Sequence, residues 1–354
     1  MQICFDETSF ISTGTERQLK LLVKYAAMAP SGHNAQPWLF RVRDGEIDLL
    51  SDFSRLIHTA DVDRREMYVS LGCALENLLI AAEQLGLSHE VTYFPDQKRD
   101  PSLVAKIRFE PGGEMSDFRS PVLFPMIPER HTNRRPFDRE PIAQEQLDLL
   151  GSCIIESGVI ADFTANSEER KTLNRLILQA DHNQLGNPGY RQELARWTDR
   201  GSFGEPWLRA HLHGFLLRRC GNLDLESRRD EELLKSVPMF GVISTAGNSR
   251  TLQVKAGQAF QRMWLMATAL GIQIHPMTRV LQVANLKDDL RELIASGDLY
   301  PQQTFRMGYA KPDRHPIKRR PVADLIVENG ADGTLENCVV KAVQGGRRIR
   351  HGFQ

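Results

Sequence analysis

The sequence predicts an α+β fold in which two related halves are fused on one chain of 354 residues. A helix and a hairpin can be assigned near the start, one long helix recurs later, and a segment rich in Gly, Pro and Ser separates the two copies. We therefore expect a first half at residues 1–115, a second half at 116–330 and a C-terminal tail at 331–354.

The first half opens with a helix that leads into a hairpin. A capping box and apolar residues at helical spacing predict a helix over residues 15–27, which Pro30 ends. Two strand-like runs, 38–43 and 46–50, then flank Asp44-Gly45, a dipeptide that favours a tight hairpin turn because both residues tolerate positive φ.

Residues 30–38, PSGHNAQPW, join this helix to the hairpin. Such a stretch can serve only to turn the chain, with Asn34 and Gln36 satisfying the backbone of the loop. It can also be a rigid loop that presents amide and hydroxyl groups to a ligand. The residues alone leave both interpretations open.

An internal repeat supports the division into halves. Residues 71–87 and 256–272 align without gaps, with identical pairs at Gly72/Gly257, Ala74/Ala259, Ala82/Ala267, Leu85/Leu270 and Gly86/Gly271. Two unrelated helices would share about one identity at this length. The alternative is two ordinary amphipathic helices, each closed by a glycine cap. We favour a duplication, with residues 111–128 as the seam.

Two clusters of basic residues lie in the second half. The motif RHTNRRPFD, residues 130–138, offers planar guanidinium groups and short polar side chains suited to a phosphate. A predicted strand at 305–309 is followed by Lys318-Arg319-Arg320 in a segment bounded by prolines. Each cluster alone would ordinarily be a solvated face. If the two meet in space, they form an anion site.

Composition and motifs exclude several function classes. The net charge is 0 and no apolar stretch approaches the roughly 20 residues of a membrane span, so we expect neither nucleic acid nor a membrane as partner. The cysteines form no CxxC pair, which favours a reduced, cytoplasmic protein. Dinucleotide, P-loop and serine-nucleophile motifs are missing, and His211 and His213 have no companions at metal-ligand spacing.

Taken together, these motifs resemble the FMN-dependent nitroreductase superfamily. The resemblance rests on APSGHNAQPW, the helices that end in Leu-Gly, RHTNRRPFD and the segment GYAKPDRHPIKRRPVADLIV. The combination of DRREMYVSLGCALENLL with RHTNRRPF is similar to the Acg-type NAD(P)H nitroreductases of actinobacteria, in which two halves are fused. It covers roughly residues 15 to 328 and implies a nitroreductase-like fold built as a pseudo-dimer.

The resemblance implies an FMN site at the interface between the halves. The phosphate and ribityl contacts that it implies are Arg130, Thr132, Arg134, Lys318 and Arg320. The implied contacts to the ring and its polar edge are Pro30, Ser31, Gly32 and Asn34, braced by Gln36 and Trp38. The segment expected to approach flavin N5 is Pro276, Met277 and Thr278.

The chain also departs from the family pattern in both halves. The first half has SFISTGTERQ in place of a phosphate-binding Arg-x-Ser-x-Arg motif, and the second half has no PSxxNxQPW. One FMN site per chain is therefore expected. The second half instead carries an aromatic-rich stretch, residues 187–207, which either covers the flavin as a lid or packs its aromatic side chains into the core as a helix pair.

The implied function is that of an oxidoreductase. FMN would take electrons from NAD(P)H and pass them to a nitroaromatic, a quinone or an unknown organic acceptor, and no side chain is expected to act as a catalytic acid or base. The alternative is a flavin-sequestering or redox-sensing protein with an occluded flavin and little turnover. As a pseudo-dimer, the chain is expected to be a monomer or a homodimer.

Overall fold

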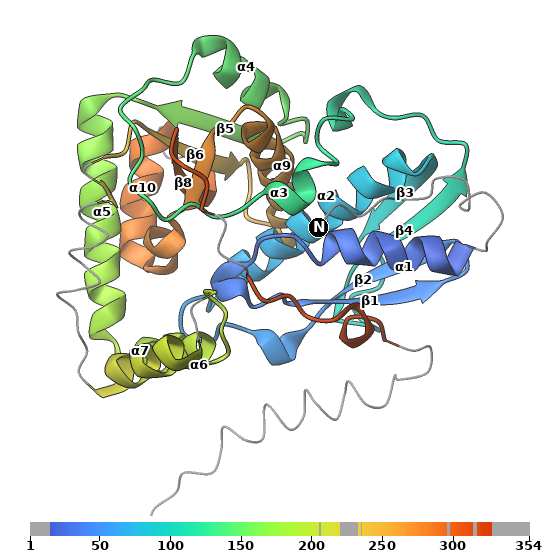
Figure 1. Cartoon of the computed structure of the whole chain (residues 1–354), viewed down its shortest axis with the longest axis horizontal. Coiled ribbons are helices and arrows are strands. Elements are labelled where there is room, and N and C mark those ends of the chain that lie inside the picture. The colour runs from blue at the N-terminus through green and yellow to red at the C-terminus, as the bar shows by residue number, and fades with distance from the viewer. Residues whose placement is uncertain are drawn as a thin grey trace, which may run out of the picture.

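Two antiparallel four-stranded sheets form the frame of the molecule (Figure 1). The computed structural model describes residues 15–204, 207–219, 233–234, 236–295, 298–313 and 317–327, so the predicted tail lies outside the described residues. The first sheet has the order β1-β2-β4-β3, from β1 (Trp38–Arg43), β2 (Glu46–Ser51), β3 (Leu87–Tyr93) and β4 (Leu103–Pro111). The second has the order β5-β6-β8-β7, from β5 (Val159–Thr164), β6 (Met239–Thr245), β7 (Gln273–Pro276) and β8 (Tyr300–Gly308).

The two sheets repeat one topology in detail. Each is built from its strands in the same chain order, and all pairs are antiparallel. The second strand of each sheet also carries a register shift, between Leu49 and Leu50 in β2 and between Ile243 and Ser244 in β6. This agreement supports two fused halves, while the boundary between residues 115 and 116 stays a prediction.

The repeated helices are α2 (Arg65–Gln84) and α9 (Arg250–Ala269), and they cross each other between the sheets (Figure 1). A Cβ atom on Gly72 would lie 2.0 Å from the carbonyl oxygen of Val254, and one on Gly257 would lie 2.0 Å from that of Val69. The shared glycines therefore allow the two backbones to touch. Because any side chain would force the helices apart, this pair of the repeat is a packing requirement.

The helices that precede each sheet end at equivalent places. In the first half, α1 (Thr15–Ala26) ends where the Asn77 side chain donates to the carbonyl oxygen of Tyr25 at 3.1 Å. In the second half, α4 (Gln144–Ser152) ends where Arg262 donates to that of Cys153 at 2.7 Å. Asn77 and Arg262 occupy the same position of the repeat. The predicted helix and hairpin of the first half are confirmed as α1, β1 and β2.

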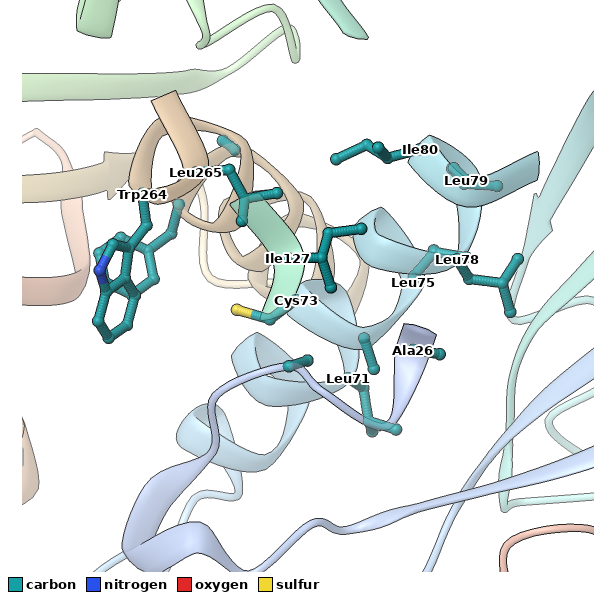
Figure 2. Close-up of a cluster of buried hydrophobic side chains, with 14 of the residues drawn as sticks. Ala26, Leu71, Cys73, Leu75, Leu78, Leu79, Ile80, Ile127, Trp264 and Leu265 are labelled. Carbon is teal, nitrogen blue, oxygen red and sulfur yellow. The ribbon is translucent and has the colours of Figure 1, made fainter. Parts of the chain in front are cut away.

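Figure 2 shows apolar side chains of α2 and α9 in the main core. Leu71 and Leu75 of α2 and Trp264 of α9 are buried, as is Ile127 from the short helix α3 (Met126–Glu129). Burying such a side chain stabilises the fold by about 1.5–3 kcal/mol relative to leaving it exposed. The crossing is therefore both the centre of the core and the junction of the two halves.

A helical insertion distinguishes the second half. The insertion lies between β5 and β6 and contains α5 (Ser167–Gly186), α6 (Pro188–Asp199) and α7 (Trp207–Arg219). A further helix of this half, α10 (Ala284–Ala295), lies between β7 and β8.

Short 3₁₀ helices occur at η2 (Gly32–Asn34), η3 (Phe53–Arg55), η4 (Asp117–Arg119), η5 (Thr278–Gln282) and η6 (Val322–Asp324). Within the described ranges, no helix is both long and apolar enough to cross a membrane.

The C-terminal part of the described chain returns to the first half. Ile326 forms a parallel bridge with Phe40 of β1, and the Phe40 N–H donates to the carbonyl oxygen of Leu325 at 2.7 Å. Figure 1 shows this dark red segment running beside β1. The segment covers the edge of the first sheet and brings residues 317–320 against the loop at 30–36.

Candidate functional site

The three polar motifs of the sequence meet around one hollow. Its volume is about 390 Å³ including the space open to solvent. The residues that line it are Pro30, Ser31, His33, Asn34, Arg130, Thr132, Arg134, Ser202, Phe203, Ile317 and Arg319. Both halves contribute, because loop 30–36 follows α1 and the other residues belong to the second half or its C-terminal segment.

Loop 30–36 has an unusual backbone. His33, Asn34 and Gln36 have φ values of 48°, 51° and 51°, in the left-handed region that side-chain-bearing residues rarely adopt. Each costs of order 1–3 kcal/mol, and such strain gathers at functional sites. The loop is fixed by its own bonds, since the Gln36 N–H donates to Ser31 Oγ at 2.9 Å. The prolines and hydroxyl of the motif therefore serve rigidity.

Side-chain amides join this loop to the C-terminal segment. Asn34 Nδ2 donates to the carbonyl oxygen of Lys318 at 2.9 Å, and Gln36 Nε2 donates to the same oxygen at 3.3 Å. Gln36 Oε1 accepts from the Arg320 N–H at 2.9 Å. The Gln36 side chain thus both donates to and accepts from the backbone of the C-terminal segment, as the backbone of a neighbouring strand would. The bracing interpretation of Gln36 fits this geometry.

Arg130 is a buried cation with unused donors. Its residue is 4% exposed, and its guanidinium lies 4.5 Å from the ring centroid of Trp264. One bond is formed, from Nη2 to the carbonyl oxygen of Met28 at 3.4 Å, while Nε and Nη1 are buried without a partner. Burial, and then the charge of Arg319, lower the pKa of Arg130 to about 9. A guanidinium keeps its proton in proteins, so this environment favours binding of an anion.

Arg319 is the second guanidinium at the hollow, and its side chain is partly buried. It donates to the carbonyl oxygens of Ala29 at 2.7 Å and Met28 at 3.0 Å, and to Asn34 Oδ1 at 3.2 Å. Burial lowers its pKa to about 10. Among the described residues, no carboxylate contributes to the pKa shift of Arg130 or of Arg319. An anionic ligand would stabilise two neighbouring cations in this arrangement.

The structure brings together many of the predicted residues. Those that line the hollow are Pro30, Ser31, Asn34, Arg130, Thr132 and Arg134. Others lie elsewhere. The Arg320 guanidinium donates to Asp52 Oδ2 at 3.1 Å and to three backbone carbonyls, and Lys318 contributes its backbone carbonyl to Asn34 and Gln36. In an extended segment, neighbouring side chains point to opposite sides. This alternation is the signal that could have indicated Arg319.

The segment 276–278 lies next to the basic motif without lining the hollow. Thr132 forms a parallel bridge with Ile274 of β7, which ends at Pro276. The Met277 N–H donates to the carbonyl oxygen of Thr304 at 2.8 Å, and Thr278 Oγ1 donates to Glu66 Oε1 at 3.3 Å. The segment is therefore held by β8 on one side and by α2 on the other.

Sequence reasoning missed Arg306, which shapes the basic motif. It is fully buried in β8, and its Nη2 donates to the carbonyl oxygen of Arg135 at 2.8 Å. Its guanidinium lies 4.1 Å from the ring centroid of Phe137. Arg306 therefore holds the backbone of the motif that carries Arg130 and Arg134. Its separation from the motif in sequence gave no signal for this role.

His33 faces the hollow as a neutral imidazole. Burial, then the charge of Arg279, lower its pKa to about 4, with Arg134 adding to the effect and Glu193 opposing it. Its Nδ1 is buried without a hydrogen-bond partner. His33 therefore adds an uncharged polar group to a site whose other prominent groups are cations.

The predicted lid region contributes to both the core and the hollow. Tyr190 and Trp197 of α6 are buried with Ala35 and Ile57 of the first half, as in the helix-pair alternative. Phe203, beyond the end of α6, lines the hollow, with its ring centroid 5.9 Å from that of His33. The side chain of Trp207 lies outside the described residues.

Glu193 anchors this insertion to the first half. The side chain of Glu193 lies on α6 and is 2% exposed. Its carboxylate accepts the N–H groups of His58 at 2.6 Å and Thr59 at 2.8 Å, with a longer bond from Ala60 at 3.3 Å. Hydrogen bonds to a charged group are stronger than neutral ones. The turn that carries Phe203 is thereby held over the hollow.

Comparison with known proteins agrees with this architecture. No protein-family model matches the chain. It is 28% identical over 316 residues to Putative NAD(P)H nitroreductase Rv3131 of Mycobacterium tuberculosis, covering 87% of this chain and 89% of the relative. It is 26% identical over 324 residues to Putative NAD(P)H nitroreductase acg of the same organism, covering 87% and 94%.

One solved structure is similar over most of its length. A putative nitroreductase from Anabaena variabilis matches with a TM-score of 0.53 at 11% sequence identity, covering 85% of this chain and 90% of that chain. The sequence relatives thus confirm the resemblance to Acg-type nitroreductases, and the solved structure confirms that the chain has a nitroreductase-like α+β fold.

Proposed function

We propose that the chain is an FMN-binding oxidoreductase that transfers electrons from NAD(P)H to a nitroaromatic, a quinone or another organic acceptor. The observation that carries this proposal is the buried guanidinium of Arg130, which has two partnerless donors and lies beside Arg319. A phosphate monoester would satisfy both groups with charge-assisted hydrogen bonds. The resemblance of the motifs favours FMN as its source, and the names of the sequence relatives favour NAD(P)H as the electron donor.

The residues present fit such a cofactor. Arg130, Arg319, Thr132 and Arg134 would hold the phosphate, with Arg319 taking the role that the resemblance gives to Arg320. Pro30, Ser31 and Asn34 would lie against the ring, on a loop whose conformation is set before binding. When bound, FMN would supply the hydride-accepting chemistry.

The protein's own groups would bind and orient rather than transfer protons. The two arginines neutralise the phosphate, and loop 30–36 positions the ring. At neutral pH the low pKa of His33 leaves it a neutral hydrogen-bonding group. We assign no catalytic acid or base to the hollow. Pro276, Met277 and Thr278 remain proposed neighbours of flavin N5, and the side chain of Lys318 remains a proposed phosphate contact.

Cofactor release tests the proposal directly. The purified protein should show the visible absorption of an oxidised flavin, and denaturation should release FMN rather than FAD. Arg130→Ala should weaken FMN binding about tenfold to a few hundredfold, because charge-assisted bonds contribute roughly 1.5–3 kcal/mol each. Arg135→Ala, which removes an exposed charge from the same motif, is the matched control. A colourless protein that FMN cannot reconstitute would overturn the proposal.

A second candidate function is flavin sequestration with little turnover. It is favoured by Phe203, an aromatic side chain in the helical insertion that lines the hollow. In that case, NADPH should reduce the bound FMN slowly under anaerobic conditions, while dithionite reduces it readily. Phe203→Ala should raise the NADPH rate, and Phe215→Ala on the exposed face of α7 should not. Rapid reduction of the unmodified protein by NADPH or NADH would rule out sequestration.

A further inference from the structure

Glu66, in the first turn of α2, touches the back of loop 30–36. A Cβ atom built on Gly32 would lie 2.6 Å from Glu66 Oε1 and 2.8 Å from its Cδ. Its next nearest neighbour, at 3.1 Å, is Cγ of the same side chain. Glu66 is 8% exposed and does not line the main hollow. It therefore supports the loop from the side opposite to the proposed ligand.

The same carboxylate reaches the second half. Thr278 Oγ1 donates to Oε1 at 3.3 Å, and Gln282 Nε2 donates to Oε2 at 2.5 Å. Gln282 Oε1 accepts in turn from Gln184 of α5 at 2.6 Å. Glu66 thus contacts the two segments that the resemblance places on the ring, one from each half.

Glu66 is itself firmly placed. Asp61 accepts the N–H groups of Glu66 at 2.9 Å and of Met67 at 2.8 Å, which fixes the start of α2. Arg65 Nη2 lies 4.0 Å from Glu66 Oε2 and supplies a positive charge. A side chain with its backbone fixed and both oxygens engaged is suited to act as a spacer.

Loss of the Glu66 side chain would open space beside the loop. A small pocket already lies there. Gly32 and Ala35 line it from the loop, and Asp61 and Glu66 line it from the opposite side. Without the Glu66 side chain this space would grow, and the strained loop could relax into it.

We propose that Glu66 is a positioning residue that sets the separation between loop 30–36 and segment 276–282, and so the width of the slot for the flavin ring. The effect on the flavin ring rests on the proposed function, whereas the separation of the two segments can be tested on the protein without FMN. It also assigns a reason to Gly32, whose lack of a side chain leaves room for the carboxylate.

Amide hydrogen exchange on the protein without added FMN tests the spacing. Glu66→Ala should speed exchange about tenfold or more in both segments: in residues 277–283 because the hydrogen bonds from Thr278 and Gln282 to the carboxylate are lost, and in residues 29–37 because the side chain packed at Gly32 is removed. The loop at 153–158 is the internal control and should not change. Thr278→Val should affect only the second segment. Unchanged exchange of both segments in Glu66→Ala would overturn the proposal.

A double-mutant cycle with Gly32 sharpens the test. Gly32→Ala should disturb the loop when Glu66 is present, because the new methyl group would overlap its carboxylate. In the Glu66→Ala background the same substitution should add little, giving strong coupling between the two sites. Glu66→Gln keeps the size of the side chain, so Gly32→Ala should remain disruptive there. Equal effects of Gly32→Ala in all three backgrounds would contradict the proposal.

FMN binding separates positioning from general stability. Glu66→Ala should weaken FMN binding about tenfold under conditions in which the variant is folded, and Glu66→Gln, which keeps the size of the side chain, should restore most of the affinity. Equal losses of affinity in Glu66→Ala and Glu66→Gln would contradict a spacing role. If no variant binds FMN, the exchange and coupling results still decide the spacing, and only the proposed function fails.

Discussion

The loop after α1, residues 27–37, and the loop after α4, residues 153–158, occupy equivalent places in the two halves and have different surroundings. Asn77 and Arg262, which share one position of the repeat, mark the start of each loop by bonding the carbonyl oxygens of Tyr25 and Cys153. The first loop is longer, has left-handed residues and lines a hollow. The second is short and carries Glu156, which bonds Arg262.

The balance of charge is the main difference. Near the first loop, Arg130 is buried and Arg319 is partly buried, and no carboxylate of the described residues shifts their pKa values. Near the second, Arg262 lies 2.7 Å from Glu76 and 2.8 Å from Glu156. Burial alone would lower the pKa of Arg262, but these carboxylates outweigh it and raise it. At the second loop, Arg262 is thus paired with carboxylates of the protein itself. At the first loop, Arg130 and Arg319 stay available to an anionic ligand.

The seam between the halves takes part in this internal pairing. Arg119 of η4 lies 2.8 Å from Glu76 and 2.6 Å from Glu83. The segment predicted as a linker from its Gly, Pro and Ser content is therefore packed against α2. We propose that this network is the reason for a single FMN site per chain.

Removing an arginine should destabilise the protein much more at the second loop than at the first. Arg262→Met should destabilise the protein by about 3–5 kcal/mol, because Glu76 and Glu156 would lose a buried partner. Arg130→Met should cost the FMN-free protein no more than about 1 kcal/mol, since it breaks no ion pair. Urea unfolding of both variants measures the difference. Equal destabilisation would contradict the contrast in charge balance.

Acid should weaken the internally paired region in a defined window. Burial alone would raise the pKa of Glu76, but Arg119 and Arg262 lower it to about 2 from an ordinary value of 4.5. Its contribution is therefore present above pH 4.5 and is lost as the pH falls toward 2, with a limit of about 3 kcal/mol. Glu76→Gln should flatten this part of the stability curve measured by denaturant unfolding. An unchanged slope below pH 4.5 would count against the network.

At the candidate site, acid should lower the stability of the protein at a higher pH than at the Glu76 network, and by a smaller amount. The pKa of His33 is lowered to about 4, so an unfolded chain takes up a proton below pH 6.5 that the folded protein does not. Stability should fall as the pH drops from 6.5 toward 4, by about 1–2 kcal/mol because His33 is only partly buried. His33→Phe should remove this component. A variant with the same pH dependence as the unmodified protein would show that His33 is not the titrating group.

Local signals in the sequence predicted much of this arrangement. The capping box, the helical spacing and Asp44-Gly45 gave α1 and the first hairpin, and the repeat that contains Gly72 and Gly257 indicated two related halves, whereas the crossing of the two helices was seen only in the structure. These features depend on neighbours along the chain or on a repeated pattern. The convergence of the three polar motifs came from the family resemblance, since composition carries no information on distance.

The remaining features depend on contacts between distant segments. Arg319 was passed over for Arg320 because the family pattern, rather than strand alternation, set the choice. Glu66 and Glu193 each bind atoms more than a hundred residues away, so no local pattern marks them. The division of residues 187–207 between core and hollow likewise depends on how α6 packs against the first half.

A titration of the FMN-free protein with FMN tests the central claim most directly. Because the hollow at Arg130 brings two guanidinium groups together without a carboxylate among the described residues that shifts their pKa values, we propose one FMN site there, and quenching of flavin fluorescence should saturate at one FMN per chain. Arg130→Met should raise the Kd about tenfold to a few hundredfold without changing the stoichiometry. Saturation at two FMN per chain, or an affinity that does not change in Arg130→Met, would contradict the account.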